Sequence, residues 1–316
     1  MARFQPPHTG VFMDFFKRTL NPFENKTCFL AIKSLTTEEL KELIDRAAEL
    51  SAMRAVKEQL GVLNGRYVLL VTKNEFPKTK INFQIAVKEL GGTPIVASVS
   101  GEAIEEFIDD EEYLKALTAC GLFAVVISTK KSGDASAFES TIGLPVINAN
   151  AVDSPVEGIA AVIAAKKRFG RINGLNVTFA GHFDYENNSV LCAFAKLGAN
   201  ITLLTSSERS PASEDLEYLS QFSRITAVTD KRKALKNADL LYIGGAQEGL
   251  YLDEADLEFL PANAAVSGSV PVSPSLISKT AMKNKNLLFS SQAENCVHAG
   301  KAVLCAFAEK QELKKF

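Results

Sequence analysis

The sequence predicts an α/β fold of two doubly wound, mostly parallel-sheet domains with a cleft between them. Apolar runs of strand length alternate with amphipathic segments of helix length along most of the chain. This alternation forms two blocks, joined by one strongly apolar helical segment at 155–169. The 316 residues suffice for two domains of about 150 each. Because open parallel sheets bind ligands beyond the carboxyl ends of their strands, we expect the functional site in the cleft.

The first block begins with a long helix, expected at 34–60, in which Thr36 or Thr37 caps the start and Glu39 supports the first turn. Its apolar residues recur at helical spacing. The short apolar runs that follow are typical of buried strands. We expect strands at 66–72, 94–97, 123–128 and 144–147, and helices at 79–90 and 104–119.

The second block begins after the helix at 155–169, which Gly170 ends and which carries the chain from one domain to the next. We expect strands at 176–180, 201–205, 239–243, 264–267 and 286–289, helices at 188–197, 215–222 and 231–236, and a final helix at 294–313. The predicted divisions are an N-terminal extension at 1–30, a first domain at 31–152, a second at 153–293, and a C-terminal helix at 294–316 that packs back on the first domain.

Composition excludes several classes of protein. Thirty-five basic and thirty-seven acidic side chains leave a formal charge of −2, which offers no global field for nucleic acid or an anionic membrane. The longest apolar runs are too short to span a bilayer. Residues 1–10 lack the apolar segment of a secretory signal. We therefore expect a cytoplasmic protein with no nucleic-acid or membrane partner.

Cofactor and metal motifs are absent from the sequence. Five scattered cysteines without a C-x-x-C pair and only three histidines argue against a disulfide framework or a metal site. The turn after the strand at 176–180 has one glycine where a dinucleotide fingerprint needs three, so an oxidoreductase is disfavoured. We expect no cofactor.

The first 30 residues contain Phe4, Phe12, Phe15, Phe16, Phe23 and Phe29 without a clean period. This segment is either an arm that packs on the body or on a neighbouring subunit, or an irregular lead-in.

Polar residues at helix starts are candidate site residues. Lys78, Thr79 and Lys80 open a helix, where free N–H groups and two ammonium groups could hold an anion. The alternative is a solvated basic turn, because lysines lack the planar fork that grips phosphate in two places. Glu157 and His298 are isolated polar residues, more often surface or interdomain groups than catalysts.

Several segments, in order, resemble the aspartate/ornithine carbamoyltransferase family, nearer the ornithine-type branch. The resemblance runs from about Phe29 to the C-terminus, and the last segment is the most specific. The segments are Ser-Leu-Thr-Thr-Glu-Glu-Leu at 34–40, Phe-Gln-Ile-Ala-Val-Lys-Glu-Leu-Gly-Gly at 83–92, 174–181, 187–191, 196–198, 238–242 and Ser-Gln-Ala-Glu-Asn-Cys-Val-His-Ala-Gly-Lys at 291–301.

In that family the first domain binds carbamoyl phosphate, the second binds an amino acid, and active sites form between the subunits of a trimer. The resemblance therefore implies a homo-oligomer, specifically a trimer, or an association with a catalytic paralogue. It also implies a small anion or an amino acid as the ligand class.

Most functional residues of the family are replaced at the matching positions of the first half. The family's phosphate loop, Ser-Thr-Arg-Thr-Arg, falls on 76–80, where both arginines become lysines. An arginine at the end of the next-but-one strand becomes Ser128. The His-Pro-Cys-Gln motif falls on 154–157, so its histidine becomes Ser154 and its glutamine becomes Glu157, a carboxylate that would repel phosphate.

The second half departs from the family in a similar way. An asparagine pair, Asn187 with Asn188, is kept, but the preceding residues, including Asp184, differ. The Asp-x-x-x-Ser-Met-Gly motif lands near 244–249 with no matching Asp or Ser. His-Cys-Leu-Pro becomes Gly-Ser-Val-Pro at 268–271, with Ser269 at the cysteine position, and the arginine after Ala-Glu-Asn becomes Cys296.

Ser128, Ser154 and Cys296 stand where the family has charged donors. Losing those donors removes on the order of 4–9 kcal/mol of binding free energy, or about three to six decades of affinity. We therefore predict a carbamoyltransferase-like protein without ornithine or aspartate carbamoyltransferase activity, acting in a structural, regulatory or binding role, and assign no catalytic residue. The alternative is a transferase with an altered substrate pair. An anion would then bind to Lys78, Thr79 and Lys80. A new substrate would be recognised by Ser154, Glu157, Asp184, Asn187 or His298.

Overall fold

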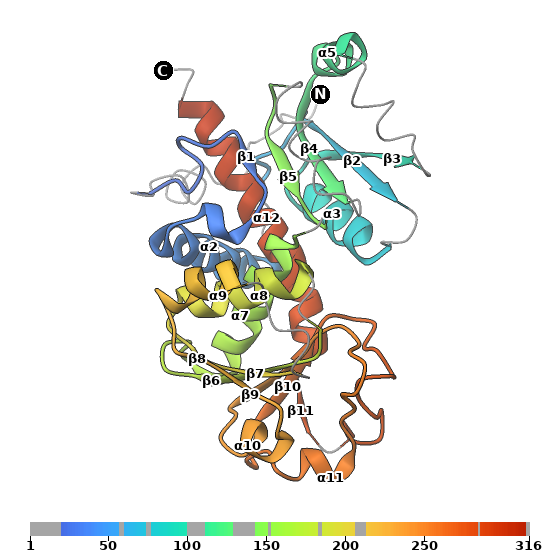
Figure 1. The fold of residues 1–316 in the computed structure, drawn as a ribbon. Coiled ribbons are helices and arrows are strands. Elements are labelled where there is room, and N and C mark those ends of the chain that lie inside the picture. Colours follow the sequence, from blue (N-terminus) through green and yellow to red (C-terminus); the bar gives the residue numbers. More distant parts are fainter. Residues whose placement is uncertain are drawn as a thin grey trace.

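A computed structural model describes residues 20–56, 60–73, 77–99, 111–128, 143–150, 153–182, 185–205, 213–283 and 285–313. It contains two parallel sheets flanked by helices, which confirms the predicted fold class (Figure 1). The first sheet has five strands in the order β1-β5-β4-β2-β3, and the second has six in the order β11-β10-β9-β6-β7-β8. Every pairing between these strands is parallel.

The first sheet and its helices follow the predicted order. The capping box of Thr36 and Glu39 forms, so the first long helix begins at Thr37 and not at Ser34; it also ends at Ala55, before the predicted end at Leu60. The elements are β1 (Cys28–Phe29), η1 (Ile32–Ser34), α2 (Thr37–Ala55), β2 (Tyr67–Lys73), α3 (Pro77–Glu89), β3 (Thr93–Val99), α5 (Glu111–Ala119), β4 (Leu122–Ser128) and β5 (Val146–Asn148). Residues 104–110 of the expected helix at 104–119 lie outside the described residues.

The second half contains two elements that the sequence analysis missed, the edge strand β8 and the one-turn helix α11. The terminal helix begins at Phe289, not at residue 294. The elements are α7 (Pro155–Phe169), β6 (Asn176–Ala180), α8 (Tyr185–Lys196), β7 (Asn200–Leu204), α9 (Ser213–Ser220), β8 (Ile225–Val228), α10 (Lys231–Leu235), β9 (Leu240–Ile243), α11 (Glu254–Leu257), β10 (Ala265–Gly268), β11 (Asn286–Leu287) and α12 (Phe289–Leu313).

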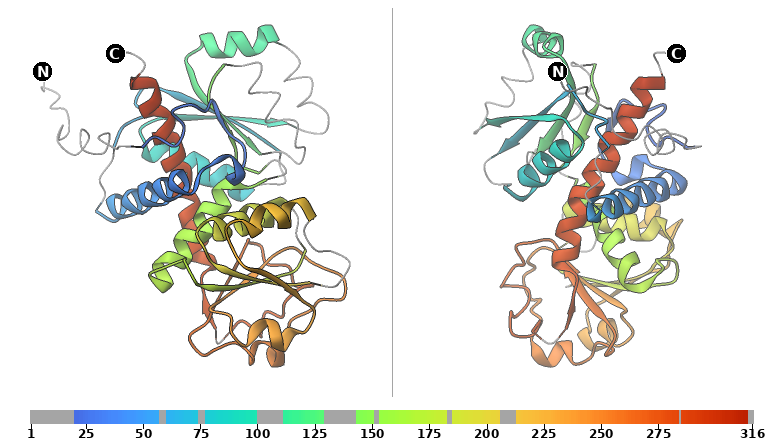
Figure 2. Two further views of the ribbon diagram at one scale, coloured as in Figure 1. Left: turned by 60° about the vertical axis from the view of Figure 1, so that its left-hand side comes forward. Right: turned by 180° about the vertical axis from the view of Figure 1, so that it is seen from behind.

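The long helix α12 runs from the second sheet to the first half of the molecule (Figures 1 and 2). It packs against α7, α2 and α3 and reaches β10. Ile159 and Val162 of α7 are buried in one core cluster with Val303 and Phe307 of α12. The helices between the two sheets therefore share a continuous core, and that core fixes the place where side chains from both halves meet.

Part of the Phe-rich segment packs on the body of the protein. Phe23 and Phe29 are fully buried, and the Phe23 ring stacks on Phe307 with centroids 4.2 Å apart. Phe4, Phe12, Phe15 and Phe16 lie outside the described residues. The predicted extension at 1–30 overlaps β1, which pairs with β5 in the first sheet, so its last residues are part of that sheet.

Helices α7 and α8 approach closely at Gly158. A Cβ atom added there would lie 2.8 Å from the backbone oxygen of Ser189, a separation that requires one helix to move. Gly300 of α12 offers a matched comparison, because a Cβ there would meet side chains at ordinary distances, the nearest being the ring of Phe83 at 3.4 Å.

We predict that Gly158→Ala lowers the free energy of unfolding by about 1–3 kcal/mol, although alanine has the higher helix propensity, because the helices must separate. Gly300→Ala should be neutral or stabilising by up to about 1 kcal/mol. Denaturant unfolding of both variants measures the difference. Equal effects of the two substitutions would contradict close packing at Gly158.

Candidate functional site

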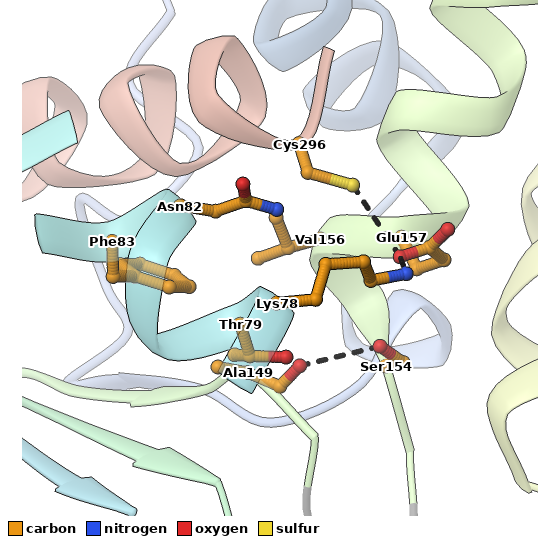
Figure 3. A pocket seen from close by; sticks show the side chains of 9 residues that line it. All are labelled: Lys78, Thr79, Asn82, Phe83, Ala149, Ser154, Val156, Glu157 and Cys296. Carbon is orange, nitrogen blue, oxygen red and sulfur yellow. Dashed lines mark hydrogen bonds and ion pairs between the residues drawn. The ribbon is translucent and has the colours of Figure 1, made fainter. Parts of the chain in front are cut away.

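A small cavity lies between the two halves, where the first turns of α3 and α7 face α12 (Figure 3). Its volume is about 10 Å³, room for about one water molecule. Nine residues line it: Lys78, Thr79, Asn82, Phe83, Ala149, Ser154, Val156, Glu157 and Cys296. Five predicted site residues therefore meet at one place.

The carboxylate of Glu157, in the first turn of α7, is the centre of this site. Its side chain is 7% exposed, yet it receives the Lys78 ammonium at 2.9 Å on Oε2. Gln292 Nε2 donates to Oε1 at 2.6 Å, the Cys296 thiol donates to Oε2 at 3.3 Å, and Ser269 Oγ lies 3.5 Å from Oε1. These donors compensate the cost of burying the negative charge.

Gln292 is held in turn by two further buried side chains. Its Oε1 accepts a hydrogen bond from Ser267 Oγ at 2.6 Å, and its Nε2 lies 3.1 Å from the Tyr242 hydroxyl oxygen. Burial and the nearby Glu157 raise the pKa of Tyr242, which keeps the phenol protonated. Sequence reasoning missed these three residues. The spacing of Gln292 and Cys296, four apart on a helix, is the signal that could have found the first.

Cys296 is a neutral donor in this site. Burial, followed by the charge of Glu157, raises the pKa of its thiol well above the ordinary value, and the opposing effect of Lys78 is smaller. A thiol with a raised pKa is a poor nucleophile and a poor metal ligand, since both roles require the thiolate. The position therefore provides a hydrogen bond to Glu157 and no positive charge.

The predicted anion site at the start of α3 is only partly available. Helix α3 begins at Pro77, and the Lys78 side chain is paired with Glu157. Thr79 lines the cavity, but Lys80 does not. One of the two ammonium groups that we expected to hold an anion is therefore engaged by the protein's own carboxylate.

Ser128 lies at the carboxyl end of β4, in register with Thr72 of β2. Both side chains are buried, and neither hydroxyl has a hydrogen-bond partner among the described residues. Ser154, at the start of α7, donates its hydroxyl to the Ala149 carbonyl at 3.2 Å, and its N–H lies 3.1 Å from Ser189 Oγ. Neither serine supplies a positive charge in place of the family's arginine and histidine.

The structure does not bring every predicted residue to the cavity. Asp184 lies outside the described residues, and the described part of Asn187 is its backbone in α8. His298 is fully buried on α12 but does not line the cavity, and in the part of the chain that the structure describes neither ring nitrogen has a hydrogen-bond partner. Burial, with Lys301, Arg54 and Lys167 nearby, lowers the pKa of His298 to about 3, so the ring is neutral.

Three further observations concern metal sites, membrane helices and cysteines. Among the residues that the structure describes, no group of three or more His, Cys, Asp or Glu side chains is placed to hold a metal ion. Within the same part of the chain, no helix combines the length and the apolar character needed to cross a membrane. The described residues include all five cysteines, and none of them forms a disulfide.

Comparison with known proteins identifies the class of the fold. Residues 28–166 match the family model of the aspartate/ornithine carbamoyltransferase carbamoyl-P binding domain. The chain superposes on the crystal structure of ornithine carbamoyltransferase from Gloeobacter violaceus with a TM-score of 0.77 and 22% identity, covering 89% of this chain and 98% of that one. The architecture is thus a carbamoyltransferase fold.

Curated relatives extend the resemblance along the chain. Ornithine carbamoyltransferase from Acidothermus cellulolyticus is 25% identical, covering 87% of this chain and 95% of the relative. The enzyme of the same name from a Parafrankia species is 27% identical, and the match covers 87% of this chain and 94% of that relative. The resemblance to the aspartate/ornithine carbamoyltransferase family is confirmed, and the ornithine-type branch is favoured.

The buried His298 predicts an acid-sensitive fold. Because its folded pKa is about 3 and its ordinary value is 6.5, the unfolded chain binds a proton below pH 6.5 that the folded chain does not. Its contribution to stability is complete above pH 6.5 and falls by about 1.4 kcal/mol per pH unit toward pH 3. His298→Leu should flatten this slope in denaturant unfolding between pH 6 and 4; an unchanged slope would contradict the assignment.

Proposed function

We propose that this chain is a carbamoyltransferase-like protein that does not transfer the carbamoyl group to ornithine or aspartate and serves a structural, regulatory or binding role. One observation carries the proposal. The Glu157 carboxylate occupies the interdomain site and holds the Lys78 ammonium, in the region where the family binds its phosphate substrate.

Electrostatics and space both oppose a phosphate ligand here. A doubly charged phosphate would have to displace the carboxylate from Lys78 or bind beside it, and like charges at close range disfavour each other. Displacement would leave Glu157 buried without its cation, a costly state. The cavity of about 10 Å³ is also far smaller than ordinary ligand pockets.

The replaced donors support the same conclusion. Cys296 already donates its thiol hydrogen to Glu157, and Ser154 donates its hydroxyl to the Ala149 carbonyl. Ser128 has only a neutral hydroxyl group. Neutral groups of this kind stabilise a developing oxyanion less than arginine or protonated histidine does. Substrate affinity and transition-state stabilisation would therefore both be weak.

We further propose that the partner is a second copy of this chain, in a trimer as the family resemblance implies, or a catalytic paralogue. Exposed large apolar side chains on β2, α3 and the edge strand β3 support an interface there, each at least 38% exposed: Tyr67, Ile81, Ile95 and Val96. The ligand class remains a small anion or an amino acid.

The second candidate is a transferase with an altered substrate pair. The names of the curated relatives support a transferase activity but not a change of substrates, since they are ornithine carbamoyltransferases that align over 95% and 94% of their own lengths. In this case Thr79 and Lys80 would still hold an anion at the start of α3, with Lys78 released from Glu157 by domain movement. Substrate-dependent turnover distinguishes the two candidates.

We predict no citrulline or carbamoyl-aspartate formation from carbamoyl phosphate with ornithine or aspartate, and no calorimetric binding of carbamoyl phosphate at millimolar concentration. The missing cations and the Glu157 charge are the reason. A related ornithine carbamoyltransferase assayed in parallel is the positive control. Millimolar or tighter binding together with turnover would overturn the proposed function.

We also predict that Glu157→Gln creates an anion site. The amide keeps the shape of the side chain but releases Lys78, so inorganic phosphate should bind at least about tenfold more tightly than to the unchanged protein. Glu294→Gln, at a 57% exposed position on the same helix as Cys296, is the matched control and should leave phosphate binding unchanged. Equal phosphate affinity in all three proteins would show that Glu157 does not block the site.

A further inference from the structure

The second sheet presents a polar face on its β6–β8 side, away from α8. Along these strands alternate side chains point to opposite faces. Ile201 and Leu203 of β7 are buried in the core that includes α8. The intervening position on each strand is a threonine: Thr178, Thr202 and Thr226. Two residues further along the strands on this face, Ala180, Leu204 and Val228 belong to an apolar cluster with α10, so only the first half of the face is polar.

The three threonines form a row across the sheet. Thr178 pairs in register with Thr202, and Thr202 pairs with Thr226. Because adjacent strands lie about 4.8 Å apart, three hydroxyl groups follow one another at this spacing. One pair earlier on the same face, Asn200 Nδ2 donates to Asn176 Oδ1 at 3.1 Å.

These side chains line a groove whose opposite wall is α10. Figure 1 shows α10 on the other side of this sheet from α8 and α9. The volume of the groove is about 320 Å³, within the range of small-molecule sites and far above that of the interdomain cavity. Lys233 and Asn237 line it from the α10 side.

Hydrogen-bonding capacity in the groove is largely unused. Thr178 donates its hydroxyl to the Ala234 carbonyl at 2.7 Å. The side chains of Thr202 and Thr226 make no hydrogen bond with any residue of the described structure. Two adjacent hydroxyls can therefore donate to or accept from a polyhydroxy ligand.

The charge of the groove is positive. Arg224, next to the start of β8, and Lys233 line it, and no acidic residue does. Both side chains are exposed, and neither takes part in an ion pair within the described ranges. A guanidinium can bind two phosphate oxygens at once, and a nearby ammonium adds charge.

We propose that this groove binds a small phosphorylated polyhydroxy compound of the sugar-phosphate class. Arg224 and Lys233 hold the phosphate, and the hydroxyls of Thr202 and Thr226 hydrogen-bond the ligand's hydroxyl groups. The groove shares no lining residue with the interdomain cavity. The site is thus independent of the Glu157 network and of the proposed function.

Titration with ribose 5-phosphate, followed by calorimetry and by NMR shifts of the β6–β8 amides, tests this proposal. We expect saturable binding, weakened about tenfold or more by Arg224→Ala and several-fold by the isosteric Thr202→Val. Lys236→Ala is the matched control, since this exposed lysine at the end of α10 does not line the groove. It should bind as the unchanged protein does.

Three results would overturn the proposal. The unchanged protein shows no saturable binding, Arg224→Ala binds as tightly as the unchanged protein, or Lys236→Ala loses as much affinity as Arg224→Ala does. Inorganic phosphate binding as tightly as ribose 5-phosphate would show a simple anion patch and would also overturn it. Because the threonine substitution keeps the shape of the side chain, Thr202→Val remains informative if Arg224→Ala fails to fold.

Discussion

A buried carboxylate is stable only when hydrogen-bond donors or a cation surround it, and the interdomain region depends on the donors around Glu157. Lys78 comes from α3, Ser269 follows β10, and Gln292 and Cys296 come from α12. One charged group on the linking helix therefore contacts the first half, the second half and the terminal helix. The helix core places these elements, and the contacts of Glu157 with them leave only a small cavity.

The Glu157–Lys78 interaction bears on the activity of the site, whereas the fold depends on other contacts. The packing of α7, α8 and α12, including the close approach at Gly158, maintains a carbamoyltransferase fold whatever the cavity contains. The Glu157 carboxylate sets the charge beside Lys78, whereas the close helix packing is made by other residues. Function belongs to sites carried on folds, so similarity to ornithine carbamoyltransferases over most of the chain is compatible with a different role.

Periodicity predicted most of the fold, because buried parallel strands and amphipathic helices leave clear patterns. It missed β8, whose side chains are half-buried or exposed, and β1, which has two residues. Within the site, the resemblance placed Glu157 at the glutamine position of the family's His-Pro-Cys-Gln motif, but it did not predict the pairing of Glu157 with Lys78 or Gln292. Lys78 and Glu157 are 79 positions apart in the sequence, and Glu157 and Gln292 are 135 positions apart. No local sequence pattern predicts contacts over such separations.

The most direct test of this account is a crystal structure of the protein soaked with inorganic phosphate at high concentration. We expect Lys78 Nζ to stay within ion-pair distance of Glu157, 2.9 Å in the present structure, and the cavity to hold no more than water. An ordered phosphate on Lys78, Thr79 and Lys80, with the Lys78–Glu157 pair broken, would contradict it.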